Sequence, residues 1–404
     1  MKKVGLLYDS MSDNTGDIAV GIALQQGLAE RGVETEIINP YNSNNIKKSF
    51  DQIIVGGGQL LRNPGDKFYD NFRIKGEFIL NSVGVSGTED FGYLSDYKFI
   101  STRSSRETSI LSKYVERERI KTLPCTTTIL SSPKYDLEKN IGPVDENEIL
   151  VGIHLVPDIE VICPDIIDII NDIPYKKIFI PFTHYNHDKS FMENLPIDHK
   201  NSFILGENLT PLELHSIIGQ MTFTLVCSLH ASIFSYSQNV PFLSMYQEKV
   251  HDYFSDRKLE KFIFRSQEEV VDLLHDFKQG KFPNFAEAVI EDRQKVNKYL
   301  DIYLQLINER TEERIVDPIV LSEIDSKQEE QEEIIHQKIQ VIQGRDRLLH
   351  YLNRNISSLK NDKNSMQNEY NKLKKDFDRI SFSKSYKIGK IITKPFRFLR
   401  KFLK

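Results

Sequence analysis

Short apolar runs alternate with amphipathic stretches over the first three-quarters of the chain. Short apolar runs, often continuous rather than alternating, are typical of strands buried in a parallel sheet. They predict strands at 4–8, 33–38, 51–55, 77–85, 98–101, 120–130, 149–155, 177–182, 223–227, 240–245 and 261–264. Helical spacing predicts helices between them, including 164–171, 209–220, 231–237, 267–277 and a long one at 285–308. This alternation predicts an α/β fold of two doubly wound, Rossmann-like domains in a GT-B-like arrangement.

The domain boundaries follow from changes in composition. A polar, turn-rich stretch at 131–147 separates an N-terminal domain (1–135) from a second domain (148–285), and 286–330 holds a helix and a charged linker. A 4-3 spacing of mostly apolar residues at 331–380 predicts a coiled coil, which implies a homo-oligomer; a single solvated helix is the alternative.

Composition adds little, but the charge distribution is informative. The chain is 39% hydrophobic and 27% charged, with a net charge of −5. Residues 381–404 nevertheless carry eight Lys/Arg and no acid, interleaved with aromatic and aliphatic side chains. Such a segment is typical of an anchor on an anionic membrane surface, with a partner protein or nucleic acid as alternatives. Nothing in the folded domains indicates nucleic-acid recognition.

The cysteines and the N-terminal stretch indicate the compartment. Cys125, Cys163 and Cys227 form no CxxC pair, which favours reduced thiols in a cytosolic protein. MKKVGLLYDS is interpreted as a first strand rather than a signal peptide. We therefore expect a cytoplasmic protein, peripheral at the inner face of the cell membrane.

Polar and titratable residues follow two neighbouring strands of the predicted second domain. Ser228 and His230 come after the strand 223–227, and Glu248 and Lys249 come after 240–245. Ligands of open α/β sheets bind at the carboxyl ends of strands, so these residues are candidate binding residues. The histidine suits acid–base chemistry near neutral pH. A structural histidine and a surface ion pair are the alternatives.

The first domain offers groups that bind anions. Gly57 and Gly58 belong to a glycine triplet after the strand 51–55, where free backbone N–H groups could face an anion, although a tight turn explains them equally. Arg103 and Arg106 open a helix and suit a carboxylate or phosphate. His184, which precedes His187 and Asp188, is a further candidate for substrate binding; the spacing of the three fits no standard metal site, so we expect no metal.

Four stretches together resemble the polysaccharide pyruvyl transferases: NTGDIAVGIAL, IIVGGGQLL, STRSSRETS and SLHASIFSYSQNVPFLSMYQEKV, within residues 1–280. The resemblance implies a GT-B-like fold and transfer of pyruvate from phosphoenolpyruvate onto a sugar of a cell-surface glycan or its lipid-linked precursor, usually as a ketal. It implies no cofactor besides this co-substrate. It also adds Asn14, Gly16 and Asp17 to the expected substrate-binding residues.

This chain departs from the family pattern at one position. The family commonly has Arg-x-His where this chain has Ser228-Leu229-His230. The histidine is expected to protonate the methylene carbon of the donor, while Lys249, Arg103 or Arg106 would replace the missing positive charge. Two other functions stay open: a GT-B glycosyltransferase using a nucleotide sugar, although the Glu-x(7)-Glu pattern of many retaining members is missing, and a non-catalytic scaffold of a polysaccharide assembly complex.

The basic tail yields a direct prediction. Deleting residues 381–404 should move the protein from the membrane fraction to the soluble fraction of a cell lysate, because the deletion removes the charges and apolar side chains that contact anionic lipid. Fractionation followed by immunoblotting measures this, and an unchanged membrane fraction would refute the anchor.

Overall fold

The computed structural model describes residues 2–10, 12–40, 50–66, 68–184, 187–206 and 209–309, and five single residues between 371 and 379. The chain divides into two units, Met1–Pro318 and Ile319–Lys404, and the continuous described ranges all lie in the first. The predicted coiled coil and basic tail lie outside the described residues, apart from those five, and stay predictions. None of the described helices is both long and apolar enough to cross a bilayer.

The first half of this unit is built on a six-stranded parallel sheet in the order β2-β1-β3-β4-β5-β6. Its strands are β1 (Lys3–Tyr8), β2 (Glu34–Ile38), β3 (Gln52–Gly56), β4 (Ile79–Val83), β5 (Phe99–Thr102) and β6 (Ile120–Thr122). The strand order reverses between β1 and β3, so the loops that follow these two strands open a crevice at the carboxyl edge.

The second half repeats this architecture with the order β12-β11-β10-β7-β8-β9, again wholly parallel. Its strands are β7 (Leu150–His154), β8 (Lys176–Phe179), β9 (Ser202–Ile204), β10 (Phe223–Val226), β11 (Phe242–Met245) and β12 (Ile263–Phe264). Here the order reverses between β7 and β10, which gives a second crevice.

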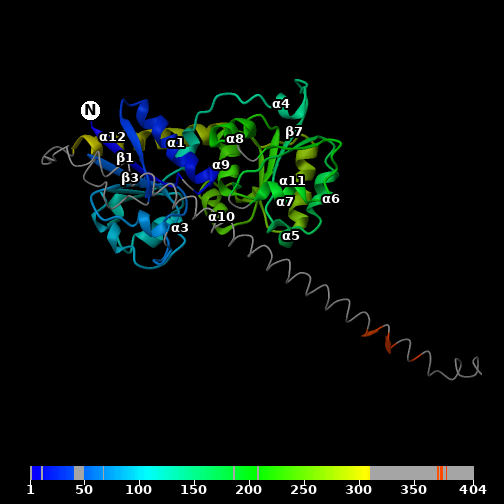
Figure 1. Ribbon diagram of the computed structural model, residues 1–404, viewed down its shortest axis with the longest axis horizontal. Helices are drawn as coiled ribbons and strands as arrows, with labels where there is room; N and C mark the ends of the chain where they lie inside the picture. The colour runs from blue at the N-terminus through cyan, green and yellow to red at the C-terminus, as the bar shows by residue number, and fades with distance from the viewer. Residues whose placement is uncertain are drawn as a thin grey trace, which may run out of the picture. The chain divides into compact units, whose positions relative to one another are not determined.

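Helices cover the sheets (Figure 1). The α-helices are α1 (Thr15–Ala29), α3 (Ser105–Leu111), α4 (Glu138–Ile141), α5 (Ile159–Ile162), α6 (Ile166–Asn171), α7 (Asp188–Glu193), α8 (Pro211–Ile218), α9 (Leu229–Ser237), α10 (Glu248–Ser255), α11 (Gln267–Lys278) and α12 (Ala286–Glu309). Short 3₁₀ turns are η2 (Tyr69–Phe72), η3 (Gly92–Asp96), η4 (Arg117–Arg119), η5 (Thr126–Ile129) and η7 (Glu260–Phe262).

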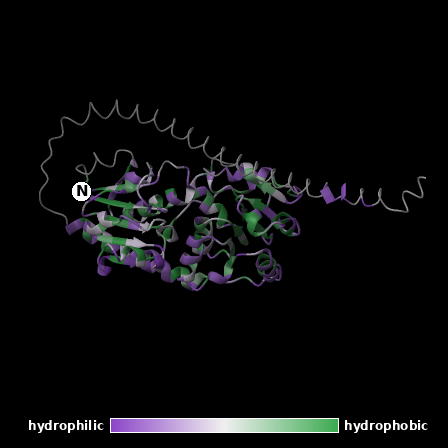
Figure 2. Cartoon of the chain, turned by 90° about the horizontal axis from the view of Figure 1, so that it is seen from below, coloured by the Kyte–Doolittle hydropathy of each residue, from purple (hydrophilic) through white to green (hydrophobic). Residues whose placement is uncertain are grey.

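Burial on both faces explains the continuous apolar runs. All residues of β3, β4, β5, β7, β10 and β11 are buried, as expected for parallel strands covered by helices on each side. Figure 2 shows the hydrophobic strands inside both halves and the hydrophilic residues mainly on the surrounding helices. Capping boxes begin α3, through Ser104 and Glu107, and α8, through Thr210 and Glu213.

The helix α12 joins the second half to the first. It leaves the second half and packs beside α1 and β1 (Figure 1), where the Lys2 ammonium donates to the carbonyl oxygens of Ile307 (2.8 Å) and Asn308 (2.7 Å). One apolar cluster contains residues from β1, α1, α9, α10 and α12. On α12, the Asp292 carboxylate accepts from Arg257 at 2.8 Å and from the Tyr236 hydroxyl at 3.2 Å.

The prediction of two parallel α/β sheets is confirmed, with local exceptions. Only 120–122 of the predicted strand 120–130 is extended, because η5 follows. The strand β9 was not predicted, since its three residues are too short for a periodic signal. Helix α9 begins at Leu229 rather than residue 231, because Ser228 caps it. The boundaries at 135, 148 and 285 stay predictions, since residues up to 318 form one unit.

The join at α12 yields a prediction about stability. Asp292→Ala should lower the free energy of unfolding by about 3–5 kcal/mol, because it leaves the Arg257 guanidinium buried without its partner. Asp301→Ala, on the same helix, breaks the exposed ion pair with Arg31 and should cost less than about 1 kcal/mol. Urea denaturation measures both; equal losses would contradict a special role for the buried pair.

Candidate functional site

A cavity lies where the carboxyl edges of the two sheets meet. We call it the cationic cavity, and both halves line it. Its walls are Asn14, Asp17, Gln59, Arg62, Tyr69 and Arg103 from the first half, and Phe182, Thr183, Ser228, Leu229, His230 and Lys249 from the second. These residues follow β1, β3 and β5 on one side and β8, β10 and β11 on the other, so both crevices contribute to one site.

Arg103 is the most unusual side chain of this cavity. It is only 2% exposed, yet its Nε and Nη2 atoms have no hydrogen-bond partner among the described residues. Its backbone N–H donates to Glu107 Oε2 at 3.0 Å, which fixes the residue directly before the helix cap. A Cβ on Gly84 would lie 2.0 Å from Nη2, so the guanidinium packs directly against this glycine. A buried guanidinium with unused donors is suited to an anionic ligand.

Asp17 holds a proton more tightly than an ordinary aspartate. Burial raises its pKa to about 6, and Asp9 adds to the rise, while Arg103 and other cations oppose it. The Asn14 side-chain amide donates to Asp17 Oδ2 at 2.7 Å. A carboxyl group with this pKa exchanges protons near neutral pH, as a general acid must.

His230 lies against Asp17 across the boundary between the halves. Its Nδ1 is 3.6 Å from Asp17 Oδ1, which is too long for a hydrogen bond, and its Nε2 is 3.8 Å from Cys125 Sγ. Burial lowers the pKa of His230 well below its usual range, and the positive charges of Arg103 and Lys249 lower it further. The ring is therefore neutral near pH 7, so the pair is not an ion pair. A neutral imidazole has a ring nitrogen that can accept a proton, and the proton donation expected of His230 from the sequence stays a prediction.

Two further cations reach the cavity. Burial lowers the pKa of Lys249; Asp17 opposes this shift, while Arg103 and Arg62 reinforce it. Arg62 was not predicted from the sequence; its guanidinium lies 3.5 Å from the centre of the Tyr69 ring, and its Nε donates to the Gln59 carbonyl. Together with Arg103 they give this cavity three cationic side chains and one carboxyl group.

The wall from the second half is held by a buried network that the sequence did not reveal. His154 Nε2 donates to Asp188 Oδ2 at 2.8 Å, and its Nδ1 accepts from the Cys227 backbone. The same carboxylate accepts from the Thr183 backbone and hydroxyl. Burial raises the pKa of Asp188, but the bonds from His154 and Thr183 outweigh it and the net shift is downward. Thr183 in turn pairs with Asn14 in an isolated antiparallel bridge, which joins the halves beside the cavity.

The predicted glycines have a packing role in this structure. Gly57 and Gly58 have positive φ angles, and neither lines the cationic cavity. A Cβ on Gly58 would lie 2.2 Å from Asp17 Oδ2, and the N–H of Gly57 donates to the Asn81 carbonyl. Gly16 makes room for the histidine in the same way, because a Cβ on Gly16 would lie 2.0 Å from His230 Nδ1. These glycines allow the close approach of the acid and the base rather than presenting N–H groups to the cavity.

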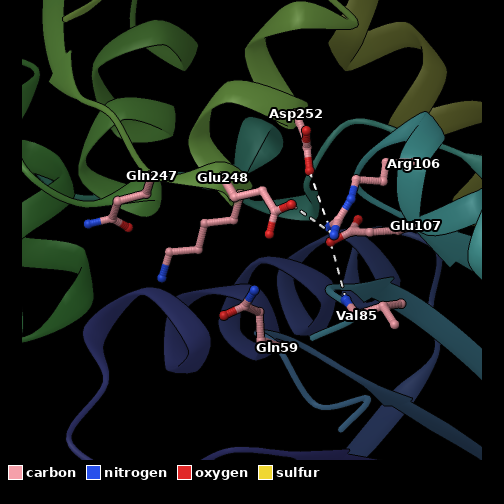
Figure 3. Close-up of a pocket in the computed structure, with 8 residues that line it drawn as sticks. Gln59, Val85, Arg106, Glu107, Gln247, Glu248 and Asp252 are labelled. Carbon is pink, nitrogen blue, oxygen red and sulfur yellow. Dashed lines mark hydrogen bonds and ion pairs between the residues drawn. The ribbon is translucent and has the colours of Figure 1, made fainter. Parts of the chain in front are cut away.

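Arg106 and Glu248 lie at an adjoining cavity, which we call the polar cavity (Figure 3). It is lined by Gln59, Val85, Arg106, Glu107, Gln247, Glu248, Lys249 and Asp252. Arg106 from α3 pairs with Glu248 (2.8 Å) and Asp252 (3.5 Å) from α10, so these charges link the two halves.

His184 lines neither cavity. Its Nε2 donates to the Leu209 carbonyl at 3.1 Å, while the nearby Asp188 is used by His154. Among the described residues, no group of three or more His, Cys, Asp or Glu is placed to hold a metal.

Comparisons with known proteins agree with this fold. A model of the polysaccharide pyruvyl transferase family matches residues 14–248, more than half of the chain. A protein from Listeria monocytogenes assigned as a UDP-N-acetylglucosamine 2-epimerase has a similar structure, with TM-score 0.51 and 11% identity over 78% of this chain and 99% of that one. S. aureus MnaA bound to UDP gives TM-score 0.49 and 13% identity over 79% and 100%. No curated protein sequence matches significantly.

The raised pKa of Asp17 predicts a pH-dependent stability. A carboxyl group that titrates near 6 in the folded chain and near 3.8 in the unfolded chain stabilises the fold below pH 3.8, and this contribution is lost as pH rises through 6. Asp17→Asn does not titrate, so it should gain about 2 kcal/mol relative to the wild type between pH 4 and pH 8. Urea denaturation across this range measures the difference. A constant difference would show that the pKa of Asp17 is ordinary.

Proposed function

Because the chain belongs to the polysaccharide pyruvyl transferase family, we propose that it transfers the pyruvyl group of phosphoenolpyruvate onto a sugar as a ketal. The acceptor is a sugar of a cell-surface glycan or of its lipid-linked precursor. Family membership makes the protein a transferase. The donor and the ketal product are the parts proposed here, and the composition of the cationic cavity supports them.

The donor carries a phosphate and a carboxylate, and the cavity offers matching charges. The single observation that carries the proposal is Arg103, whose guanidinium is buried with two nitrogens unpaired. Planar guanidinium groups bind carboxylate and phosphate in a bidentate manner, and ammonium groups bind phosphate as point charges. Arg103, Arg62 and Lys249 can therefore hold the two anionic groups of the donor at opposite ends.

The same charges compensate for the family arginine that this chain lacks. Ser228 occupies that position and caps α9 by accepting from the Ala231 N–H at 3.2 Å. The positive charge in this cavity comes mainly from the first half, through Arg62 and Arg103, with Lys249 from the second. Two of the three cations named from the sequence line this cavity, while Arg106 is paired with carboxylates nearby. These charges support a binding site for a small anion with more than one charge and weigh against a purely non-catalytic scaffold.

Asp17 and neutral His230 divide the proton transfers between them. Asp17 gives its proton to the methylene carbon while the first sugar hydroxyl bonds to C2 and passes its proton to His230. The bond between C2 and the phosphate oxygen then breaks, and its electron pair leaves with the phosphate. The second hydroxyl bonds to C2, its proton returns to Asp17, and the proton on His230 leaves with the phosphate. The cations stabilise the departing phosphate.

Donor binding provides the test. Titration calorimetry with phosphoenolpyruvate should give saturable binding to the wild type, and Arg103→Met should raise Kd at least about 100-fold, because a buried charged contact is lost. Arg106→Met is the control. It removes one positive charge, as Arg103→Met does, but at a residue outside the cationic cavity, and it should change Kd less than about threefold. Thermal melting checks that both variants are folded.

Three results would overturn the proposal: no binding of phosphoenolpyruvate to folded protein, equal losses in the two variants, or saturable binding of a nucleotide sugar in its place. The last result would establish the glycosyltransferase alternative. Mass spectrometry of the surface glycan, with and without the protein, then identifies the acceptor by an added pyruvyl group.

A further inference from the structure

The polar cavity adjoins the cationic cavity, and the two share Gln59 and Lys249 as lining residues. The rest of the polar cavity has a different chemistry. It is formed by Val85, the amide of Gln247 and the carboxyl groups of Glu107, Glu248 and Asp252. Arg106 lies between Glu248 and Asp252 (Figure 3). The lining therefore changes from cationic in one cavity to amide and carboxylate in the other, with Gln59 and Lys249 at the boundary between them.

Several of these groups retain hydrogen-bonding capacity. The Gln59 side chain makes no hydrogen bond to any described residue, and Figure 3 shows it reaching from the first half toward the second. Gln247 donates its amide to the Cys227 carbonyl at 2.8 Å, which leaves its side-chain oxygen as an acceptor. Glu248 uses Oε1 for Arg106, so its second oxygen is available. Groups of this kind accept hydrogen bonds from hydroxyl groups.

The balance of charge in the polar cavity limits what it can accept. Arg106 is already paired with two carboxylates, and Asp252 has a pKa raised by burial, with Arg106 opposing and Glu248 adding to the shift. A second anionic ligand would meet these carboxylates at close range, which costs free energy. A neutral ligand rich in hydroxyl groups would meet hydrogen-bond acceptors and donors without this repulsion.

We propose that the polar cavity is the acceptor subsite and that it selects a neutral sugar, not a uronic acid or another acidic sugar. The inference rests on the proposed function for the identity of the neighbouring ligand. The sugar lies between Gln59 and the first turn of α10, held by Gln247 and Glu248. Its reacting hydroxyls point past Lys249 toward C2 of the donor in the cationic cavity.

Ligand-observed NMR provides the measurement, with methyl glycosides of glucose, galactose and mannose and the matching methyl uronides as probes. The hexosides contain the hydroxyls that the cavity can bind, and the uronides replace one of them with a carboxylate. At least one hexoside should bind the protein saturated with phosphoenolpyruvate, and its uronide should bind at least fivefold more weakly. Glu248→Gln should weaken hexoside binding at least fivefold while leaving the Kd for phosphoenolpyruvate within twofold.

A matched control separates sugar binding from docking of the halves. Asp256 lies at the end of the same helix and accepts from the Ser105 N–H (2.7 Å) and hydroxyl (2.6 Å), so it also links the halves, but it lines neither cavity. Asp256→Asn should change hexoside binding less than twofold.

The inference fails if Asp256→Asn and Glu248→Gln have equal effects, if the uronides bind as well as the hexosides, or if no hexoside binds protein that does bind phosphoenolpyruvate. Failure of the proposed function gives different results: no binding of phosphoenolpyruvate, equal losses in the Arg103 and Arg106 variants, or binding of a nucleotide sugar in its place.

Discussion

The site depends on one close contact between the halves: the backbone of Gly16 lies against the ring of His230. A Cβ at Gly16 would be 2.0 Å from Nδ1, so only glycine allows the start of α1 to approach the start of α9. This contact brings Asp17 within 3.6 Å of the imidazole, although the two residues belong to different sheets. Within the cationic cavity, neither half alone places an acid beside a base.

Bringing the halves together in this way costs electrostatic free energy, because it buries charged side chains in the cationic cavity. The cavity brings Arg103, Lys249 and Asp17 together with little solvent, and the pKa shifts of Asp17 and Lys249 show that burial disfavours their charged forms. The packing around α12 offsets that cost, because its apolar face and the buried pair of Asp292 and Arg257 join the halves. A stable frame of this kind can hold a site whose own residues are not in their most stable arrangement.

The sequence predicted the parts of the structure whose signal is local. Apolar runs located most strands, and helical spacing at 209–220 located α8. It could not separate Arg103 from Arg106, since both flank the same serines. The position of each arginine relative to the helix cap at Ser104 separates them. Arg103 precedes the cap and is buried, whereas Arg106 lies in the first turn of α3 and faces α10.

Arg62 follows a glycine-rich loop without periodicity, so no sequence pattern marked it. That Gly57 and Gly58 bind an anion stays a prediction; their close packing against Asp17 and Tyr8 depends on contacts between distant residues, which a local sequence pattern does not reveal.

Ser228 stands where the family commonly has an arginine, and the origin of the positive charge in the cationic cavity explains how the chain can lack it. In this chain α9 supplies a histidine and a cap, while two of the three cations come from the first half. A small anion bound between them therefore contacts both halves and stabilises their contact, because its charge is balanced only when the two walls are together. The donor would also raise the proton affinity of Asp17 and His230, since it brings negative charge beside both. Binding of the donor would then keep Asp17 protonated for transfer of its proton to the methylene carbon. Donor binding and the proton transfer that activates the donor would therefore be coupled.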